Sequence, residues 1–136
     1  MIYPATNQYI DLAYNALANG EIIVYPTDTL YGFGVDATNT EAIQKLNQLK
    51  GRAQPLSIII ESIYHISKYA KVDFKLESEL NIIFPGKYTA LLIAIENNLS
   101  PMVQSGSNKI GIRIPDHFFP LKLIKLLNNP IITTSI

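Results

Sequence analysis

The sequence predicts an α/β fold, in which helices pack on a sheet within a single domain. Short apolar segments with the composition of buried strands alternate along the chain with segments whose apolar residues recur at helical spacing. The chain has 136 residues, a usual length for one domain, and 48% of them are apolar, which is enough for a core. We find no internal repeat and no low-complexity linker, so residues 1–136 are expected to form one unit.

The first expected helix covers residues 7–18, because four apolar residues share one of its faces: Ile10, Ala13, Tyr14 and Leu17. Thr6 or Asn7 can cap its start, and Gly20 can close its end. A short buried strand at 21–25 follows, and it leads into a segment, 26–37, that we expect to be a loop.

A second helix begins at Thr40, a potential cap, and ends at Gly51. Its buried stripe is predicted to consist of Ile43, Leu46 and Leu49. Pro55 prevents this helix from continuing, and a buried strand at 56–60 comes next. Residues 62–69 are expected to form another helix.

The second half of the chain continues the alternation. A helix at 76–83 stops before Pro85 and Gly86, and the strand at 88–95 lacks polar alternation, which predicts that both of its faces are covered. A loop at 97–108 precedes a strand at 110–114. The remaining elements are a helix at 118–127, with Leu121, Ile124 and Leu127 turned inward, and a strand at 131–135.

Composition excludes several classes of protein. The chain has no cysteine, which rules out a disulfide scaffold, a thiolate metal site and a cysteine nucleophile. The longest apolar run, 90–95, is too short to span a membrane, and the first residues do not resemble a signal peptide. We therefore expect a cytoplasmic protein without membrane contact.

All eleven basic residues follow residue 44. This asymmetry of charge can serve an anionic ligand, although charge counting alone favours ordinary surface solvation.

Hydroxyls and glycines gather after the first strand. Thr27, Asp28 and Thr29 lie where ligands collect in α/β sheets, and Gly32 and Gly34 allow a close approach of the backbone. The same residues also suit an ordinary turn.

The cations have similar alternatives. Lys50 and Arg52 can bind phosphate, or they can merely favour the dipole at a helix C-terminus. Arg113, within an apolar strand, needs an acidic side chain or an anionic ligand unless it faces water. Lone histidines such as His65 and His117 are usually structural. The spacing of acids and histidines suggests no metal cage.

Five segments match, in order, the motifs of a known family. They are 25–34 (YPTDTLYGFG), 50–52 (KGR), 84–89 (FPGKYT), 111–117 (GIRIPDH) and 130–135 (PIITTS). The chain therefore resembles the YrdC-type threonylcarbamoyl-AMP synthases, with their motifs P-T-[DE]-T-x-Y-G-L, K-x-R, W-P-G-P-x-T, V-A-V-R-x-P-x-H and P-x-x-x-[ST]-S-A-N. Each match is weak alone, and the ordered set is specific. The resemblance implies a single YrdC-like domain with a twisted mixed sheet.

The resemblance also implies a reaction. L-threonine, bicarbonate and ATP, accompanied by Mg²⁺, would give threonylcarbamoyl-AMP and pyrophosphate, and downstream enzymes would transfer the threonylcarbamoyl group to tRNA. Threonine binding would belong to Thr29, Tyr31 and Arg113. ATP binding would belong to Lys50, Arg52, Thr89 and Ser135. No catalytic side chain is assigned, because positioning and charge neutralisation dominate nucleotidyl transfer. Family members also resemble double-stranded RNA binders.

The chain departs from the family pattern in three places. Only two residues separate Arg52 from Pro55, Phe84 and Lys87 replace the Trp and the second Pro, and the expected Ala-Asn does not follow Ser135. The domain is therefore expected to be incomplete at its C-terminus. These departures keep two alternatives open. One is a non-catalytic RNA-binding module, or a paralogue with an altered substrate. The other is a fragment without independent function.

Overall fold

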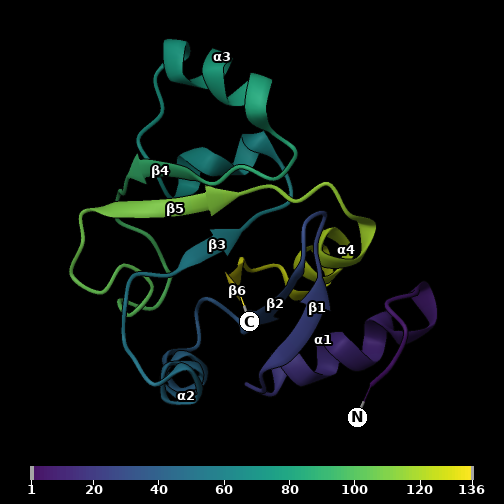
Figure 1. The fold of residues 1–136 in the computed structure, drawn as a ribbon. Helices are drawn as coiled ribbons and strands as arrows, with labels where there is room; N and C mark the ends of the chain where they lie inside the picture. The colour runs from purple at the N-terminus through teal and green to yellow at the C-terminus, as the bar shows by residue number, and fades with distance from the viewer. Residues whose placement is uncertain (1, 136) are drawn as a thin grey trace.

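The computed structural model of the chain describes residues 2–135. Its strands are β1 (Ile23–Pro26), β2 (Tyr31–Gly34), β3 (Ser57–Ile59), β4 (Ala90–Ile93), β5 (Lys109–Arg113) and β6 (Ile131–Ser135). Its α-helices are α1 (Ile10–Ala18), α2 (Thr40–Lys50), α3 (Phe74–Ile83) and α4 (Phe118–Leu127). Two short 3-10 helices are η1 (Asn7–Tyr9) and η2 (Ile63–Lys68). The predicted α/β fold class is confirmed (Figure 1).

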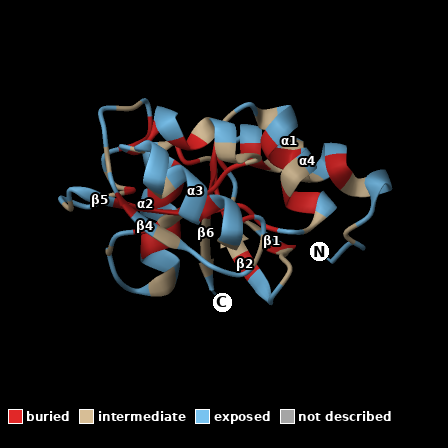
Figure 2. Cartoon of the chain, turned by 90° about the horizontal axis from the view of Figure 1, so that it is seen from above, coloured by how far each residue is buried: buried red, intermediate tan, exposed pale blue. Residues whose placement is uncertain are grey.

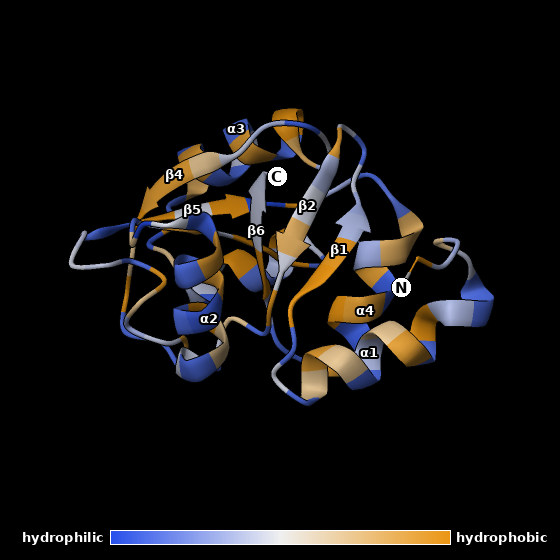
Figure 3. Cartoon of the chain, turned by 60° about the horizontal axis from the view of Figure 1, so that its bottom comes forward, coloured by the Kyte–Doolittle hydropathy of each residue, from blue (hydrophilic) through white to orange (hydrophobic). Residues whose placement is uncertain are grey.

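The six strands form one mixed sheet in the order β1-β2-β6-β3-β5-β4. Strands β3 and β5 pair in parallel, and the other neighbours pair antiparallel. β6, the last strand in the sequence, lies inside the sheet between β2 and β3, and Figure 3 shows the C-terminus at its end. The hydroxyl-rich end of the chain is therefore placed beside the β1–β2 hairpin.

The two faces of the sheet are covered by different helices. Ile58, Ile112 and Ile132 are fully buried in a cluster that includes residues of α2, η2 and α3, and we call this side the α2 face. Neighbouring residues of a strand point to opposite sides. Ile59 and Ile131 accordingly belong to a second cluster, with α1 and α4, on what we call the α4 face. Figure 2 shows α1 and α4 lying together, with buried stripes along both helices.

The segment predicted as a loop, 26–37, contains a strand. β2 pairs with β1 in a hairpin whose register sets Pro26 opposite Tyr31 and Tyr25 opposite Gly32. The prediction was wrong because the two glycines of β2 hide its alternation. Gly34 is required by packing, since a Cβ atom there would lie 2.6 Å from Cε1 of the buried Tyr25 ring. The hairpin packs the Tyr25 ring against Gly34 of β2, and the local sequence does not indicate this contact.

The strand predicted at 88–95 has one covered face rather than two. β4 is an edge strand, in which Leu92 is buried while Leu91 and Ile93 are exposed by 67% and 55%. The apolar run was misleading because the opposite side of β4 carries no helix. Leu49, predicted in the buried stripe of α2, is likewise 59% exposed.

Helix ends agree with the sequence in most places and differ in a few. α4 has the predicted bounds, and Gly51 (φ 76°) ends α2 as expected. Asn39, not Thr40, caps α2: its Oδ1 accepts a hydrogen bond from the Ala42 backbone N at 3.0 Å. The segment predicted as a helix at 62–69 is the 3-10 helix η2. No helix among residues 2–135 combines the length and apolarity needed to cross a membrane.

Candidate functional site

The α4 face is covered at one end and open at the other. α1 and α4 pack over Tyr25, Ile59 and Ile131, which we call the covered half. Ser57 and Thr133 lie two residues from Ile59 and Ile131 on the same strands. The register pairs Ser57 with both Gly111 and Thr133. These three residues and Thr89 form what we call the open half.

Small and hydroxyl-bearing residues make the surface of the open half. A Cβ atom on Gly111 would lie 2.6 Å from Ser57 Oγ and 3.4 Å from Thr89 Cγ2, so these side chains meet above the glycine. Ser57 and Thr133 are half-buried, and Thr89 is exposed. No hydrogen bond of the Ser57 hydroxyl to another described residue is present, so its donor and acceptor are available to a ligand.

Arg113 lies at the boundary between the two halves, paired in register with Ile59. Its Nη2 forms an ion pair with Asp28 Oδ1, and its Nε donates to the Gly86 carbonyl oxygen at 3.0 Å. The guanidinium is thus largely buried and paired with an acidic side chain, so Arg113 does not simply face water.

Lys50 reaches the end of β6. Its Nζ donates to Thr134 Oγ1 at 2.8 Å and to the Ser135 carbonyl oxygen at 2.7 Å. Two predicted site residues, Lys50 and Ser135, are therefore brought together although 85 positions separate them. Arg52 is exposed, and its side chain has no hydrogen bond or ion pair with the described residues, whereas its backbone N donates to the Asn47 carbonyl oxygen at 3.1 Å.

The loop at 27–30, between β1 and β2, is ordered by its own hydroxyls. Thr27 Oγ1 donates to the Leu30 carbonyl oxygen at 2.7 Å and accepts from the Thr29 backbone N at 3.2 Å. The Thr29 hydroxyl lies 3.1 Å from Thr27 Oγ1. Because the Thr27 hydrogen is already used, Thr29 is the donor in this contact, and its oxygen keeps free acceptor capacity.

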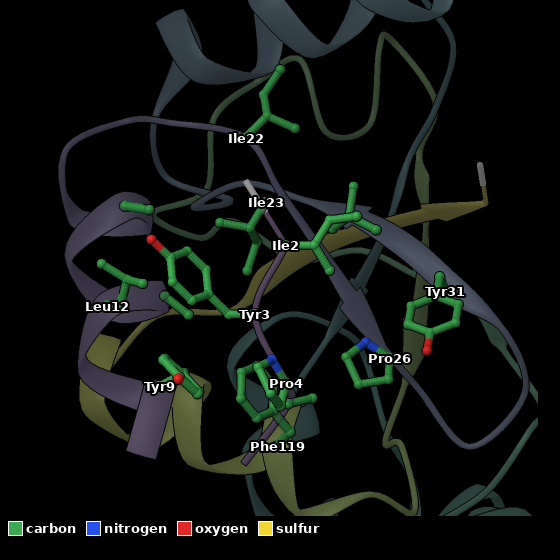
Figure 4. Close-up of a pocket in the computed structure, with 14 residues that line it drawn as sticks. Ile2, Tyr3, Pro4, Tyr9, Leu12, Ile22, Ile23, Pro26, Tyr31 and Phe119 are labelled. Carbon is green, nitrogen blue, oxygen red and sulfur yellow. The ribbon is translucent and has the colours of Figure 1, made fainter. Parts of the chain in front are cut away.

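Tyr31 points away from the open half. Gly32 and Gly34 lie on the α4 face with Tyr25, so the register turns Tyr31 to the opposite side of the hairpin. Its ring lines an apolar groove of about 980 Å³ between α1, β1 and the N-terminal segment (Figure 4). The structure does not bring Tyr31 together with Thr89 and Arg113. The groove is mainly apolar, whereas the polar groups suited to an oxygen-rich ligand lie on the open half.

Tyr25 is a polar residue of the site region that sequence reasoning missed. Its hydroxyl lies 3.5 Å from the Ile132 carbonyl oxygen. Burial raises the pKa of Tyr25 to about 12, against smaller lowering effects from a hydrogen bond with Thr133 and the charge of Arg113. The phenol is therefore a neutral donor that fixes the position of β6. Its place opposite a glycine in a hairpin becomes recognisable only once β2 is identified as a strand.

The histidines have structural contacts. His117 Nδ1 accepts from the Phe119 backbone N at 3.1 Å and so caps α4. His65 lies 2.8 Å from Ser62 Oγ and 3.6 Å from a Glu61 carboxylate oxygen. Neither residue contacts the open half through any of these bonds.

Comparison with known proteins adds an independent finding. The family model for Sua5, YciO and YrdC, described as "Telomere recombination", matches residues 15–136. The chain is similar to the threonylcarbamoyl-AMP synthases of Mus musculus (34% identity over 121 residues) and Bacillus subtilis (32% over 126 residues), with 88% of the chain covered in each case. The crystal structure of P. abyssi Sua5 complexed with L-threonine superimposes with a TM-score of 0.86 at 28% identity over 99% of the chain.

The chain spans less than half the length of these relatives. It covers 42% of the mouse protein, 35% of the Bacillus protein and 40% of P. abyssi Sua5.

Proposed function

We propose, since the chain belongs to the Sua5/YciO/YrdC family, that it is an L-threonylcarbamoyladenylate synthase domain. Its substrates would be L-threonine, bicarbonate and ATP, and its products threonylcarbamoyl-AMP and pyrophosphate. The product would serve threonylcarbamoyladenosine modification of tRNA. The protein would then act in the cytoplasm, with enzymes that transfer the threonylcarbamoyl group as its partners. Residues 1–136 would form one YrdC-like domain.

The convergence of Lys50 on the end of β6 carries this proposal. It gathers a cation, the Thr134 hydroxyl and the Ser135 carbonyl oxygen at the end of β6. The alternation of β6 turns Thr134 to the α2 face, so Lys50 approaches this end of the sheet from the side opposite the open half. Lys50 and Arg52 would neutralise the triphosphate of ATP, and the Arg52 side chain, which has no partner among residues 2–135, is available for this role. A cluster of this kind suits an anionic, oxygen-rich ligand.

The other proposed site residues are assigned to threonine, to phosphate or to the nucleotide. Thr29 would hold threonine, and Arg113 would donate to an anionic group of threonine or phosphate. Thr89 and Ser135 would hydrogen-bond substrate or nucleotide oxygens. Tyr31 would contribute to threonine binding only from the other side of the hairpin, because of its register.

The proposed chemistry requires no protein nucleophile. The amine of threonine forms a C–N bond to the carbon of bicarbonate, with loss of water, and gives a carbamate. A carbamate oxygen then bonds to the α-phosphorus, and the bond from that phosphorus to the bridging oxygen breaks, so pyrophosphate leaves with the electron pair. The protein orients the reactants and neutralises charge as the adenylyl group is transferred.

A metal ion would enter with the nucleotide. Among residues 2–135 no group of three or more acidic or histidine side chains is placed to hold a metal. Mg²⁺ would therefore be held mainly by the phosphates of ATP and by water.

The test is threonine-dependent release of pyrophosphate. The protein is incubated with ATP and bicarbonate, with and without L-threonine, and pyrophosphate is measured. We expect release that requires threonine and that falls when L-serine replaces it. Release that is independent of threonine, or no release by a folded protein, would contradict the proposal.

A second candidate is a non-catalytic double-stranded RNA-binding module. Lys109 is exposed on the α4 face. Lys87 is also exposed, and its Nζ lies 5.6 Å from the ring centroid of the next residue, Tyr88. Such a module would retain duplex RNA with an affinity that falls steeply with salt, and Arg52→Ala would not change that affinity. RNA retention without threonine-dependent pyrophosphate release would favour this candidate.

A further inference from the structure

We propose that Asp28 is a positioning residue, which holds Arg113 and the loop at 27–30 in the arrangement that threonine binding requires. This inference rests on the proposed function. Asp28 is not itself assigned to any substrate. Its carboxylate acts through two neighbours: Arg113, to which it is paired, and Thr29, which follows it in the chain.

The ion pair is well shielded from solvent. The side chains of Arg113 and Asp28 are only 9% and 14% exposed. A charge buried to this degree requires a partner, and removing one partner leaves the other uncompensated. Asp28 therefore has few alternative positions, and the loop that carries it is fixed with it.

The pair joins three segments that meet at the boundary of the open half. Asp28 belongs to the β1–β2 loop, Arg113 ends β5, and Gly86 accepts from Arg113 Nε in the turn after α3. The Gly86 backbone N also donates to the Ile114 carbonyl oxygen at 2.8 Å. The turn that leads to Thr89 and the loop that bears Thr29 are thus both attached to the end of β5.

Arg113 keeps a free donor for a ligand despite this pairing. Nε and Nη2 have the partners named above, while Nη1 has none among the described residues. No fully buried side-chain nitrogen or oxygen of the described residues lacks a partner, so Nη1 is not fully enclosed, in keeping with the 9% exposure of the side chain. A guanidinium held on two sides presents its remaining N–H groups in one fixed direction.

The pairing also sets the charge of the site. The Asp28 carboxylate compensates the Arg113 charge, so among the proposed site residues Lys50 and Arg52 are the cations without an acidic partner in the described part of the chain. Arg113 would then act by the direction of its hydrogen bonds more than by net charge. Because of Asp28, the Asp28–Arg113 pair adds no net charge to the proposed threonine site. The proposed nucleotide site keeps the positive charges of Lys50 and Arg52.

Asp28→Asn tests the proposal, with Asp28→Glu as the conservative variant. Asp11→Asn is the matched control, because it removes an exposed carboxylate on α1 that has no partner among the described residues. In the pyrophosphate assay we expect Asp28→Asn to raise the KM for L-threonine about tenfold or more, with kcat and the KM for ATP within about threefold. Asp28→Glu should restore part of the loss, and Asp11→Asn should behave as the unmodified protein. An unchanged KM for threonine in Asp28→Asn would overturn the proposal.

Amide hydrogen exchange provides a readout that does not depend on activity. The Thr27 and Gly86 backbone N–H groups donate to Leu30 and Ile114 carbonyl oxygens, and both should exchange faster in Asp28→Asn. Amides of Ile58 and Ile132 in the core should not change. Equal acceleration at all four positions would indicate general destabilisation and would overturn the positioning role. Local acceleration in a protein that releases no pyrophosphate would instead retain the role of Asp28 as the anchor of this loop and reject the proposed function.

A double variant covers the case in which Asp28→Asn does not fold. Asp28→Asn combined with Arg113→Gln removes the pair without leaving a buried charge. Faster exchange at Thr27 and Gly86 in this protein supports the proposal, and unchanged exchange at both positions overturns it.

Discussion

The two halves of the α4 face differ although they are built from the same strands. Ile59 and Ile131 are fully buried under α1 and α4, while Ser57 and Thr133, two positions away on those strands, are half-buried and polar. A step of two residues keeps the same face of a strand. The change from core to candidate site is therefore set by where the helices end, and the residue types follow that boundary.

Arg113 marks the boundary between the halves. It pairs in register with the apolar Ile59, yet its ion pair with Asp28 turns toward the loop that carries Thr29. A buried cation is tolerated there because the carboxylate is adjacent. One half therefore supplies rigidity, and the other supplies open hydrogen-bonding capacity.

The largest expected difference between the halves is in stability. Ile59→Ala should lower the free energy of unfolding by about 2–5 kcal/mol, because it leaves a cavity in the covered half. Ser57→Ala on the same strand should change it by less than about 0.5 kcal/mol. Urea unfolding at neutral pH measures both. Similar losses in the two variants would mean that the open half is packed as tightly as the covered one.

Alkaline pH should weaken the covered half through Tyr25. Because burial raises the pKa of Tyr25 from 10.0 to about 12, its stabilising contribution is complete below pH 10 and is lost as the pH rises through 12. A difference of about two pKa units corresponds to a loss of roughly 2–3 kcal/mol. Unfolding measured from pH 9 to pH 12 should show this loss, and Tyr25→Phe should show a smaller one. Equal slopes in both proteins would assign the effect to other groups.

A methyl group added to each half should be tolerated differently. In Gly34→Ala the new Cβ would lie 2.6 Å from the buried Tyr25 ring and 3.1 Å from Ile131 Cγ2, which cannot move easily. We expect a loss of about 1–3 kcal/mol. In Gly111→Ala the nearest atom is the Ser57 hydroxyl, which can rotate, so a loss of about 1 kcal/mol or less is expected.

The second glycine substitution has an internal control. Ser57→Ala combined with Gly111→Ala removes the hydroxyl contact and should recover part of the lost stability. Thermal unfolding of the single and double variants measures the coupling. A double variant less stable than the sum of the single changes would show that the glycine has another role.

The last expected effect, on activity rather than on folding, is at Lys50. Lys50→Ala should lower kcat/KM for ATP about tenfold, which is about 1.4 kcal/mol, because it removes a cation beside β6. Lys45→Ala, an exposed lysine on the same helix, is the control and should leave the rate unchanged. Unfolding of both variants should stay within about 1 kcal/mol of the unmodified protein. Equal rates for the two variants would place ATP elsewhere.

Much of the fold could be predicted because local chemistry decides it. Gly51 adopts a left-handed φ that stops α2, and α4 has the bounds predicted for it. β2 was missed because Gly32 and Gly34 remove the side-chain pattern on which strand prediction depends. β4 was misjudged because an apolar run does not reveal that a strand lies at the edge of a sheet.

The candidate site likewise combines residues that the sequence predicted with contacts that it did not. Ordered motifs singled out Thr29, Lys50, Arg52, Thr89, Arg113 and Ser135 as candidates, and whether they bind substrate stays a prediction. Neither the motifs nor their spacing indicated that Asp28 is the partner of Arg113, or that Tyr31 faces away from the open half.

The sequence by itself determined most of the elements, with β2 as the main exception, and the residues rich in hydroxyls and charge, because capping, periodicity and residue type act over a few positions. Only the tertiary structure decided which of these residues meet. Strand order sets β6 inside the sheet, the register assigns each side chain to a face, and the positions of α1 and α4 divide that face into core and open surface. These are contacts between distant segments, and no local pattern in the chain records them.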